Sequence, residues 1–233
     1  MVNSKYTIHN VFPSKIYQKK LEEHDNLKNI LLELYPSYSF DPLSKQGYYL
    51  ATGEHHGKVD VHKEKDLINF FVQLKQALRE YFEHLNIPSD FFDFTITKSW
   101  YTYLLKDYSV NGHTHFGNGL SFVYYIESGG EKFELDFVDS YERKSQSFGG
   151  SFMGTVGKSQ DYFRNAFIQN STYKLISEEG TLLLFPSYLA HGIPPFSGSS
   201  HRLSYVGDIF ISLKEEYLDF EFGYPSQNNW LII

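Results

Sequence analysis

The spacing of the hydrophobic residues changes near residue 90, and this change limits what the chain can fold into. Before it, two stretches repeat apolar residues every three or four positions, as one face of a helix does. The first, expected to end at Pro36, repeats four leucines: Leu21, Leu27, Leu31 and Leu34. The second follows Asp66 and ends before Pro88, with a longer stripe: Leu67, Phe70, Phe71, Leu74, Leu78, Tyr81, Phe82 and Leu85. We expect both helices to pack on one face of a sheet.

From about residue 94 the apolar residues alternate with period two, which indicates strands. The candidate strands are separated by clusters of Gly, Ser, Asn and Pro: Phe94–Leu105, Leu120–Ile126, Lys132–Val138, Thr181–Phe185 and Leu203–Leu213. Aromatic residues make up 18% of the chain, and their rings pack well on a pleated sheet. Helices followed by strands predict a mainly β, α+β fold in which the N-terminal helices support a sheet.

The length of 233 residues favours a single domain over 1–233, because β barrels and sandwiches of this size commonly fold as one unit. We divide it into helical support over 1–90, a β core over 94–213 and a tail over 214–233. The Gly- and Ser-rich segment 140–172 lies between two candidate strands. It is longer than most loops of a compact domain, so it is a candidate lid insertion.

The composition excludes several classes of site and partner. The chain has no cysteine, which excludes disulfides, thiolate zinc sites, iron–sulfur clusters and cysteine nucleophiles. Its 21 basic and 28 acidic residues give a net charge of −7, and no basic cluster indicates a nucleic-acid partner. The sequence has no signal-peptide or membrane-span pattern, so a cytoplasmic location is expected, in the host cytoplasm if the protein is phage-encoded.

His113-Thr114-His115 is the first candidate for chemistry. In an extended segment, residues i and i+2 project to the same face, so the two imidazoles would converge. Two imidazoles on one face suit Fe, Zn, Cu or Ni. A third histidine, His191, ends the later segment Phe185–His191.

Arg202-Leu203-Ser204 begins eleven residues after His191. On a strand, Arg202 and Ser204 share one face and Leu203 takes the other. A guanidinium binds a carboxylate through two parallel hydrogen bonds, and a serine hydroxyl adds a further donor. The pair is therefore a candidate clamp for an anion.

Taken in order, these motifs resemble the 2-oxoglutarate- and Fe(II)-dependent dioxygenase superfamily, and more narrowly its phage and marine-bacterial family. The shared elements are a Trp strand, HxH, a Tyr-Tyr strand, Phe-Pro-Ser-x-x-x-His and Arg-x-Ser. Here they read Trp100, His113-Thr114-His115, Ser121–Ile126, Phe185–His191 and Arg202-Leu203-Ser204. The match covers about residues 66–212.

The resemblance implies a double-stranded β-helix, or jelly roll, and an enzyme that uses Fe(II), 2-oxoglutarate and O₂, with ascorbate in support. Such an enzyme hydroxylates its substrate and releases succinate and CO₂. The resemblance assigns Arg202 and Ser204 to the C5 carboxylate of 2-oxoglutarate, and Tyr103 as a further contact. It assigns no catalytic residue beyond the metal centre. Because side chains alternate along a strand, at most one of Tyr124 and Tyr125 faces the site.

The third metal ligand stays open, because the superfamily's carboxylate ligand falls at His115, which is not acidic. In the set we favour, His113, His115 and His191 hold the metal together, since the i,i+2 geometry delivers both imidazoles. In a second set, Glu134 or Asp136 on the following strand supplies a carboxylate. In a third, His113 and His191 are the only protein ligands, and an anion or water completes the site.

Two functions of other classes also stay open. A cupin-like metal enzyme that does not use 2-oxoglutarate would share the barrel and the histidines, but would not need Arg202. A non-catalytic jelly-roll module for binding or structure would need neither. The expected partner is a small-molecule or peptide substrate. The sequence indicates no nucleic-acid or membrane partner, and it determines neither the substrate nor the oligomeric state.

Overall fold

The computed structural model describes residues 14–39, 50–138 and 172–217. The candidate lid, apart from its last residue Thr172, and the tail beyond residue 217 lie outside the described residues. The division of the chain into one domain with these parts therefore stays a prediction.

The two predicted helices are present as α1 (His24–Tyr38) and α2 (Ile68–His84). Short 3-10 turns occupy Gly53–His56, Val61–Lys63, Lys65–Leu67, Ser89–Phe91 and Glu215–Tyr217. The apolar stripe of α2 is buried as expected, at Phe70, Leu74, Ala77, Leu78, Tyr81 and Phe82. None of the helices among the described residues is long and apolar enough to cross a membrane.

The predicted end of the first helix at Pro36 is wrong by two residues. Pro36 lies inside α1, which continues to Tyr38 before the N–H of Ser39 donates to the carbonyl of Tyr35. A proline in the last turn removes only one hydrogen bond, so the helix can continue briefly past it. Leu21 precedes the helix, although its side chain is buried in the same core as Leu27 and Leu31.

The strands run in chain order through two sheets. They are β1 (Tyr17–Lys20), β2 (Leu50–Thr52), β3 (Phe92–Leu105), β4 (Val110–His113), β5 (Leu120–Glu127), β6 (Phe133–Val138), β7 (Thr172–Ser177), β8 (Thr181–Pro186), β9 (Ala190–Ile193) and β10 (His201–Leu213). The five predicted strands are β3, β5, β6, β8 and β10. Four of the strands that the sequence pattern missed, β1, β2, β4 and β9, have three or four residues, too few for a clear alternation. The fifth, β7, has six residues, but only Leu175 and Ser177 of it are buried.

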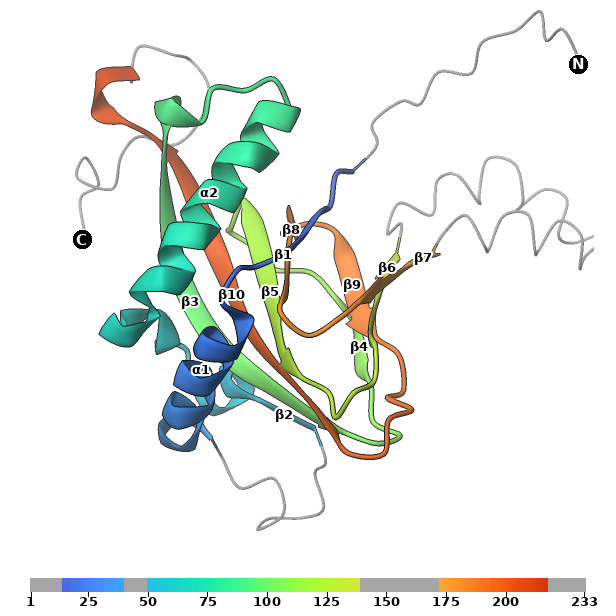
Figure 1. The fold of residues 1–233 in the computed structure, drawn as a ribbon. Coiled ribbons are helices and arrows are strands. Elements are labelled where there is room, and N and C mark those ends of the chain that lie inside the picture. The colour runs from blue at the N-terminus through green and yellow to red at the C-terminus, as the bar shows by residue number, and fades with distance from the viewer. Residues whose placement is uncertain (1–13, 40–49, 139–171, 218–233) are drawn as a thin grey trace, which may run out of the picture.

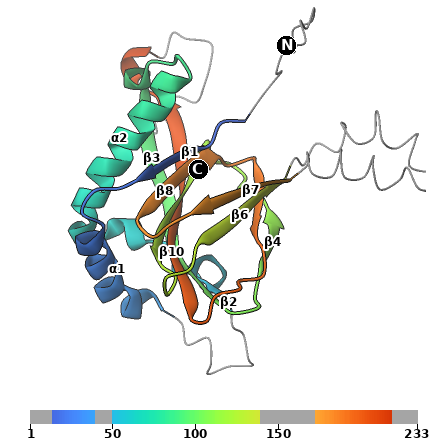
Figure 2. The same cartoon turned by 45° about the vertical axis from the view of Figure 1, so that its right-hand side comes forward.

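The two antiparallel sheets have the strand orders β1-β8-β5-β10-β3-β2 and β4-β9-β6-β7. Strands β3, β5, β8 and β10 lie in the large sheet, and β4, β6, β7 and β9 lie in the small one. Figures 1 and 2 show the small sheet on the side of the molecule away from α1 and α2. Eight strands distributed in this way form a jelly roll, which confirms the predicted fold class.

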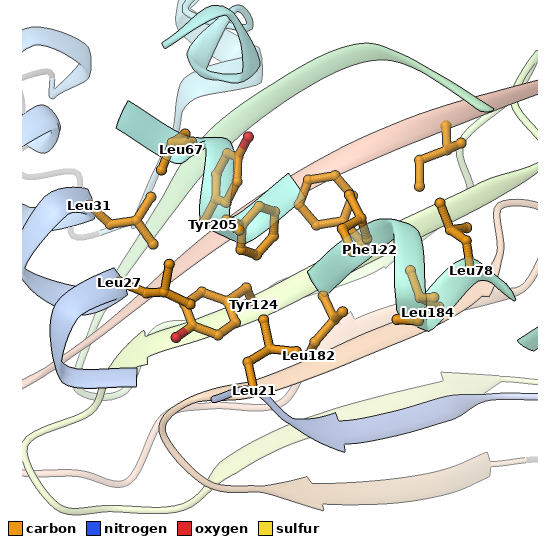
Figure 3. Close-up of a cluster of buried hydrophobic side chains, with 14 of the residues drawn as sticks. Leu21, Leu27, Leu31, Leu67, Leu78, Phe122, Tyr124, Leu182, Leu184 and Tyr205 are labelled. Atoms are coloured by element: carbon orange, nitrogen blue, oxygen red, sulfur yellow. The ribbon is translucent and has the colours of Figure 1, made fainter. Parts of the chain in front are cut away.

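Two hydrophobic cores lie on opposite faces of the large sheet. One fills the space between this sheet and the helices, and Figure 3 shows Phe122, Tyr124 and Tyr205 of the sheet within it. The ring of Phe70 lies 5.7, 5.4 and 5.2 Å from these three rings, measured between centroids. The other core is built mainly from inward-facing strand residues, among them Val206. The helices therefore cover the outer face of the large sheet and leave the space between the sheets for a site.

Replacing Phe70 by alanine should lower the free energy of unfolding by about 3–5 kcal/mol, since it leaves a cavity among three aromatic rings. Val72 lies on the same helix but is 62% exposed, so Val72→Ala should cost no more than about 0.5 kcal/mol. Urea unfolding followed by circular dichroism measures both values. Equal costs for the two substitutions would contradict this description of the core.

Candidate metal centre

A cavity of about 360 Å³ is lined by residues of both sheets. Its lining includes His113, His115 and His191, and also Arg202 and Ser204. The structure therefore brings the predicted metal ligands and the predicted anion clamp to one cavity, although they are far apart in the sequence.

Strand pairing sets the positions of the histidines. His113 ends β4 and lies directly opposite His191 on β9. Gly192 permits this close approach, because a Cβ there would lie 2.8 Å from the carbonyl oxygen of Val110. His115 follows the end of β4, where its N–H donates to the carbonyl of Ser187 over 2.9 Å.

The three imidazoles face one another. The distances between ring centroids are 5.0 Å for His113 and His115, 4.6 Å for His113 and His191, and 5.2 Å for His115 and His191. One potential ligand atom of each histidine lies within 4.8 Å of the other two. His115 and His191 are buried and His113 is exposed, so the cluster lies at the edge of the interior.

Hydrogen bonds indicate which nitrogen of each ring is free. The Nδ1 atoms of His113 and His191 lie 2.9 Å from the carbonyl oxygens of Asn111 and Leu189, and that of His115 lies 2.9 Å from the carboxylate of Asp208. These oxygens only accept hydrogen bonds, so each Nδ1 carries the proton and each Nε2 keeps its lone pair. Nε2 of His115 is buried and has no hydrogen-bond partner among the described residues. An unpartnered buried nitrogen that faces two further imidazoles fits a metal ion.

The pKa of His191 is well below its ordinary value. Burial is the main cause, and the neighbouring imidazoles of His113 and His115 add to it, lowering the pKa to about 3. His191 is therefore neutral at neutral pH, which is the form that binds a metal.

Arg202 is a buried cation, only 2% exposed. Its Nη1 donates to the carbonyl of Glu134 over 2.7 Å, and its guanidinium lies over the rings of Tyr125 and Phe133 at 5.3 and 5.2 Å. Its Nε has no partner, and in residues 14–39, 50–138 and 172–217 no carboxylate lies within ion-pair distance of it. A buried charge without a counterion is costly, so this position suits an anionic ligand.

Hydroxyl groups lie beside the guanidinium in a row across three strands. The pairing places Thr52 of β2 opposite Thr102 of β3, and Thr102 opposite Ser204 of β10. All three residues line the cavity, and the hydroxyls of Thr52 and Ser204 are buried without a hydrogen-bond partner among the residues that the structure describes. The sequence interpretation missed both threonines. Thr102 is two residues from Trp100 on β3, so both side chains lie on the face that lines the cavity.

The prediction that Tyr103 contacts a ligand in the site is wrong in this structure. Tyr103 lies opposite Leu203, on the helix-covered face of the large sheet, and stacks on the rings of Tyr35 and His201. Trp100 and Tyr103 are three residues apart on one strand, so their side chains take opposite faces. The expected alternation of the next strand is observed, with Tyr124 in the helix-covered core and Tyr125 in the core between the sheets.

The alternative carboxylate ligands do not reach the histidines. Phe133, Leu135 and Phe137 of β6 are buried toward the space between the sheets, and Glu134 and Asp136 alternate with them and do not line the cavity. Glu134 instead pairs with Lys174 at 2.8 Å. Of the two sets in which the protein supplies three ligands, the structure brings together only the one with three histidines, within the part of the chain that it describes.

The sequence interpretation missed the acid closest to this cluster, Asp208. Asp208 is fully buried on β10 and accepts hydrogen bonds from Nδ1 of His115 at 2.9 Å and from the hydroxyl of Ser121 at 2.7 Å. Nζ of Lys98 lies 3.4 Å from the carboxylate and also pairs with Glu54. Burial alone would raise the pKa of Asp208, but these hydrogen bonds and charges lower it.

Comparison with known proteins supports the resemblance seen in the motifs. Residues 98–208 match the model of the family described as "Putative 2OG-Fe(II) oxygenase". Over that segment, this match confirms the predicted resemblance to the family. No curated protein matches the sequence.

Solved structures with similar folds include a Pseudomonas putida prolyl-4-hydroxylase, with 12% identity over 84% of this chain and 91% of that one and a TM-score of 0.49. A viral collagen prolyl hydroxylase from Paramecium Bursaria Chlorella virus-1 has 11% identity over 83% and 94%, with a TM-score of 0.45. EvdO2 from Micromonospora carbonacea has 13% identity over 86% of each chain and a TM-score of 0.49.

The buried, neutral His191 predicts an acid-sensitive fold in the metal-free protein. Its pKa is about 3 when folded, against about 6.5 when unfolded, so between these values the unfolded state binds one proton more. Its contribution to stability is complete above the unfolded pKa and is lost as the pH falls toward the folded one. Wild type should therefore lose about 1.4 kcal/mol per pH unit more than His191→Gln between about pH 6 and pH 4. Urea unfolding in a chelator measures this slope, and parallel curves would contradict the prediction.

Proposed function

We propose, for a chain whose residues 98–208 belong to the 2OG-Fe(II) oxygenase family, that the whole protein is an Fe(II)- and 2-oxoglutarate-dependent oxygenase. In this proposal it hydroxylates a small-molecule or peptide substrate, consumes O₂, releases succinate and CO₂, and is supported by ascorbate. One observation carries the proposal. Three convergent histidines, each hydrogen-bonded through Nδ1, line the same cavity as a buried arginine that has no counterion among the described residues.

His113, His115 and His191 are the residues that would hold the iron. Neutral imidazoles are suitable ligands for Fe(II), and three of them on one side of an ion leave positions open on the other. Bound iron, together with 2-oxoglutarate and O₂, supplies the oxidation chemistry that protein side chains lack. The part of this chain is to hold the three Nε2 atoms in place and to keep their Nδ1 protons on fixed acceptors.

Arg202 is the residue that would hold the distal carboxylate of 2-oxoglutarate. A dicarboxylate placed in this cavity can reach the histidine cluster with one end and the guanidinium with the other, since both line the same space. The hydroxyls of Ser204 and Thr52 add donors that have no other partner. Apolar walls formed by Trp100, Val123, Leu135 and Val206 would keep water away from the bound co-substrate.

The two rival functions explain less of this arrangement. A cupin-like enzyme without 2-oxoglutarate would leave the buried guanidinium of Arg202 without a reason. A non-catalytic jelly-roll module would leave the three convergent imidazoles without one as well. Both rivals are outcomes of the experiments that follow.

The metal site predicts which substitutions remove iron binding. His113→Ala, His115→Ala and His191→Ala should each abolish tight binding of Fe(II), because each removes one of three ligands. Asp136→Ala is the matched control and should bind as wild type does, since Asp136 does not line the cavity. Anaerobic titration calorimetry measures the affinity, and circular dichroism checks that each variant is folded. If Asp136→Ala loses the metal while His115→Ala keeps it, the ligand set with a carboxylate replaces ours.

The co-substrate site predicts a large effect at Arg202. Removing one partner of a buried charged pair costs about 3–5 kcal/mol, so Arg202→Ala should weaken 2-oxoglutarate binding by about two to four orders of magnitude. Arg202→Lys should restore part of it, as a point charge without the bidentate fork. Arg79→Ala, at an exposed position on α2, is the control.

Calorimetry of 2-oxoglutarate binding to the metal-loaded protein gives the affinities, and succinate formation with Fe(II), ascorbate and O₂ gives the activity. Binding of 2-oxoglutarate by Arg202→Ala as tight as by wild type would remove the oxygenase assignment. The cupin-like enzyme would then be the better interpretation.

A further inference from the structure

We propose that Asp208 is a positioning residue for the metal centre, which holds His115 in the Nδ1–H tautomer and aims its Nε2 at the point where the three histidines converge. This inference rests on the proposed function, which gives Asp208 no role of its own. Asp208 touches neither the convergence point nor the anion clamp, and it acts through His115.

The three histidines differ in how their rings are oriented. His113 and His191 each bond through Nδ1 to the carbonyl two residues earlier, at Asn111 and Leu189. Their orientation is therefore set within their own short segments. His115 has no such local bond, and its Nδ1 partner is Asp208, 93 residues away in the sequence.

His115 needs a distant partner because it lies beyond the end of β4. Its backbone N–H donates to the carbonyl of Ser187, but His115 takes no part in the ladder of strand pairs. Its ring stacks on Trp100, with 5.7 Å between centroids and 15° between planes. Stacking limits the plane of the ring, but it does not decide which nitrogen carries the proton. The carboxylate of Asp208 does, because it can only accept.

Asp208 is itself fixed from both sides of β10. It pairs across the sheet with Lys98 on β3 and with Ser121 on β5, and the side chains of both residues contact its carboxylate, at 3.4 and 2.7 Å. The carboxylate is fully buried and close to the middle of the sheet. It is thus a rigid acceptor for the histidine proton.

The chemistry gives this contact a measurable effect. A carboxylate on the far nitrogen of a metal-binding imidazole fixes its tautomer and raises its basicity, and loss of such a partner typically weakens metal binding about 10–100-fold. Three neutral imidazoles also leave the charge of a divalent ion uncompensated, and Asp208 places one negative charge a single ring away. Asp208 would therefore act on both the direction and the strength of the third ligand.

The test compares Asp208→Ala, Asp208→Asn and the control Ser212→Ala, a buried position on the same strand that does not line the cavity. Long-range proton–nitrogen NMR spectra of the metal-free proteins identify the tautomer of His115, and calorimetry with Co(II) gives metal affinity. Wild type should show the Nδ1–H tautomer. Asp208→Ala should shift His115 toward the Nε2–H tautomer and weaken Co(II) binding about 10–100-fold.

Asp208→Asn keeps a neutral acceptor in the same shape, so it should fall between wild type and Asp208→Ala in both measurements. Ser212→Ala should keep the wild-type tautomer and change Co(II) affinity less than about threefold, less than the typical loss of a direct partner. If Asp208→Ala does not fold, Asp208→Asn decides the test. A wild-type tautomer of His115 together with wild-type Co(II) affinity in Asp208→Asn would then overturn the inference.

The two proposals fail in different ways. A wild-type protein that binds no Co(II) or Fe(II) would overturn the proposed function. The tautomer of His115 in the metal-free protein would still decide whether Asp208 positions it. A wild-type protein that binds metal, with an Asp208→Ala variant that binds it equally well and keeps the Nδ1–H tautomer, would overturn the inference alone.

Discussion

The alternation of side chains along β10 is the constraint on which the rest of the structure depends. This strand lies between β3 and β5, and its neighbouring residues face opposite sides of the large sheet. Leu203 and Tyr205 enter the helix-covered core, while Arg202 and Ser204 line the cavity. A slip of one residue would place the guanidinium among the helices and the tyrosine ring in the cavity. The apolar residues that bind α1 and α2 to the sheet therefore also fix the register of the polar ones.

This register creates a cavity whose charges are only partly compensated. Asp208 has Lys98 and His115 beside it, so its negative charge is balanced within the protein. Arg202 has a carbonyl and two aromatic rings, but no carboxylate in the described ranges. Because Arg202 is buried, its charge is screened less by solvent and acts over a longer range than it would at the surface. A metal at the histidines would add a second positive site to the same cavity, and this pairing is what favours a dicarboxylate with one group for each.

Elements with a long periodic pattern of apolar residues were predicted from the sequence. Short strands, and the sheet face taken by some single side chains, were missed. Helix α2, with its apolar stripe at Phe70, was predictable from its periodicity. The strands β3, β5, β6, β8 and β10 were predictable from apolar patterns over six or more residues. Strands β4 and β9 have four residues each, so only the folded chain shows that His113 lies opposite His191. The assignment of Tyr103 failed because Tyr103 takes the face of β3 opposite to that of Trp100, which lines the cavity. Asp208 could also have been identified from the sequence. It is six residues from Arg202 on the predicted strand, so both side chains are expected on the same face.

The site draws its groups from both sheets, and this explains why it needs a complete jelly roll. His113 and His191 come from β4 and β9 of the small sheet, whereas Arg202 and Ser204 come from β10 of the large one. Neither sheet alone holds both the cluster of imidazoles and the guanidinium. The core between the sheets, where Phe185 of the large sheet packs against the ring of His191 at 4.7 Å, sets the distance between them. His115 belongs to the loop that joins the sheets, and its bond to Asp208 ties that loop to the large sheet. The ligand with the least backbone support is thus the one whose direction depends most on a buried charge.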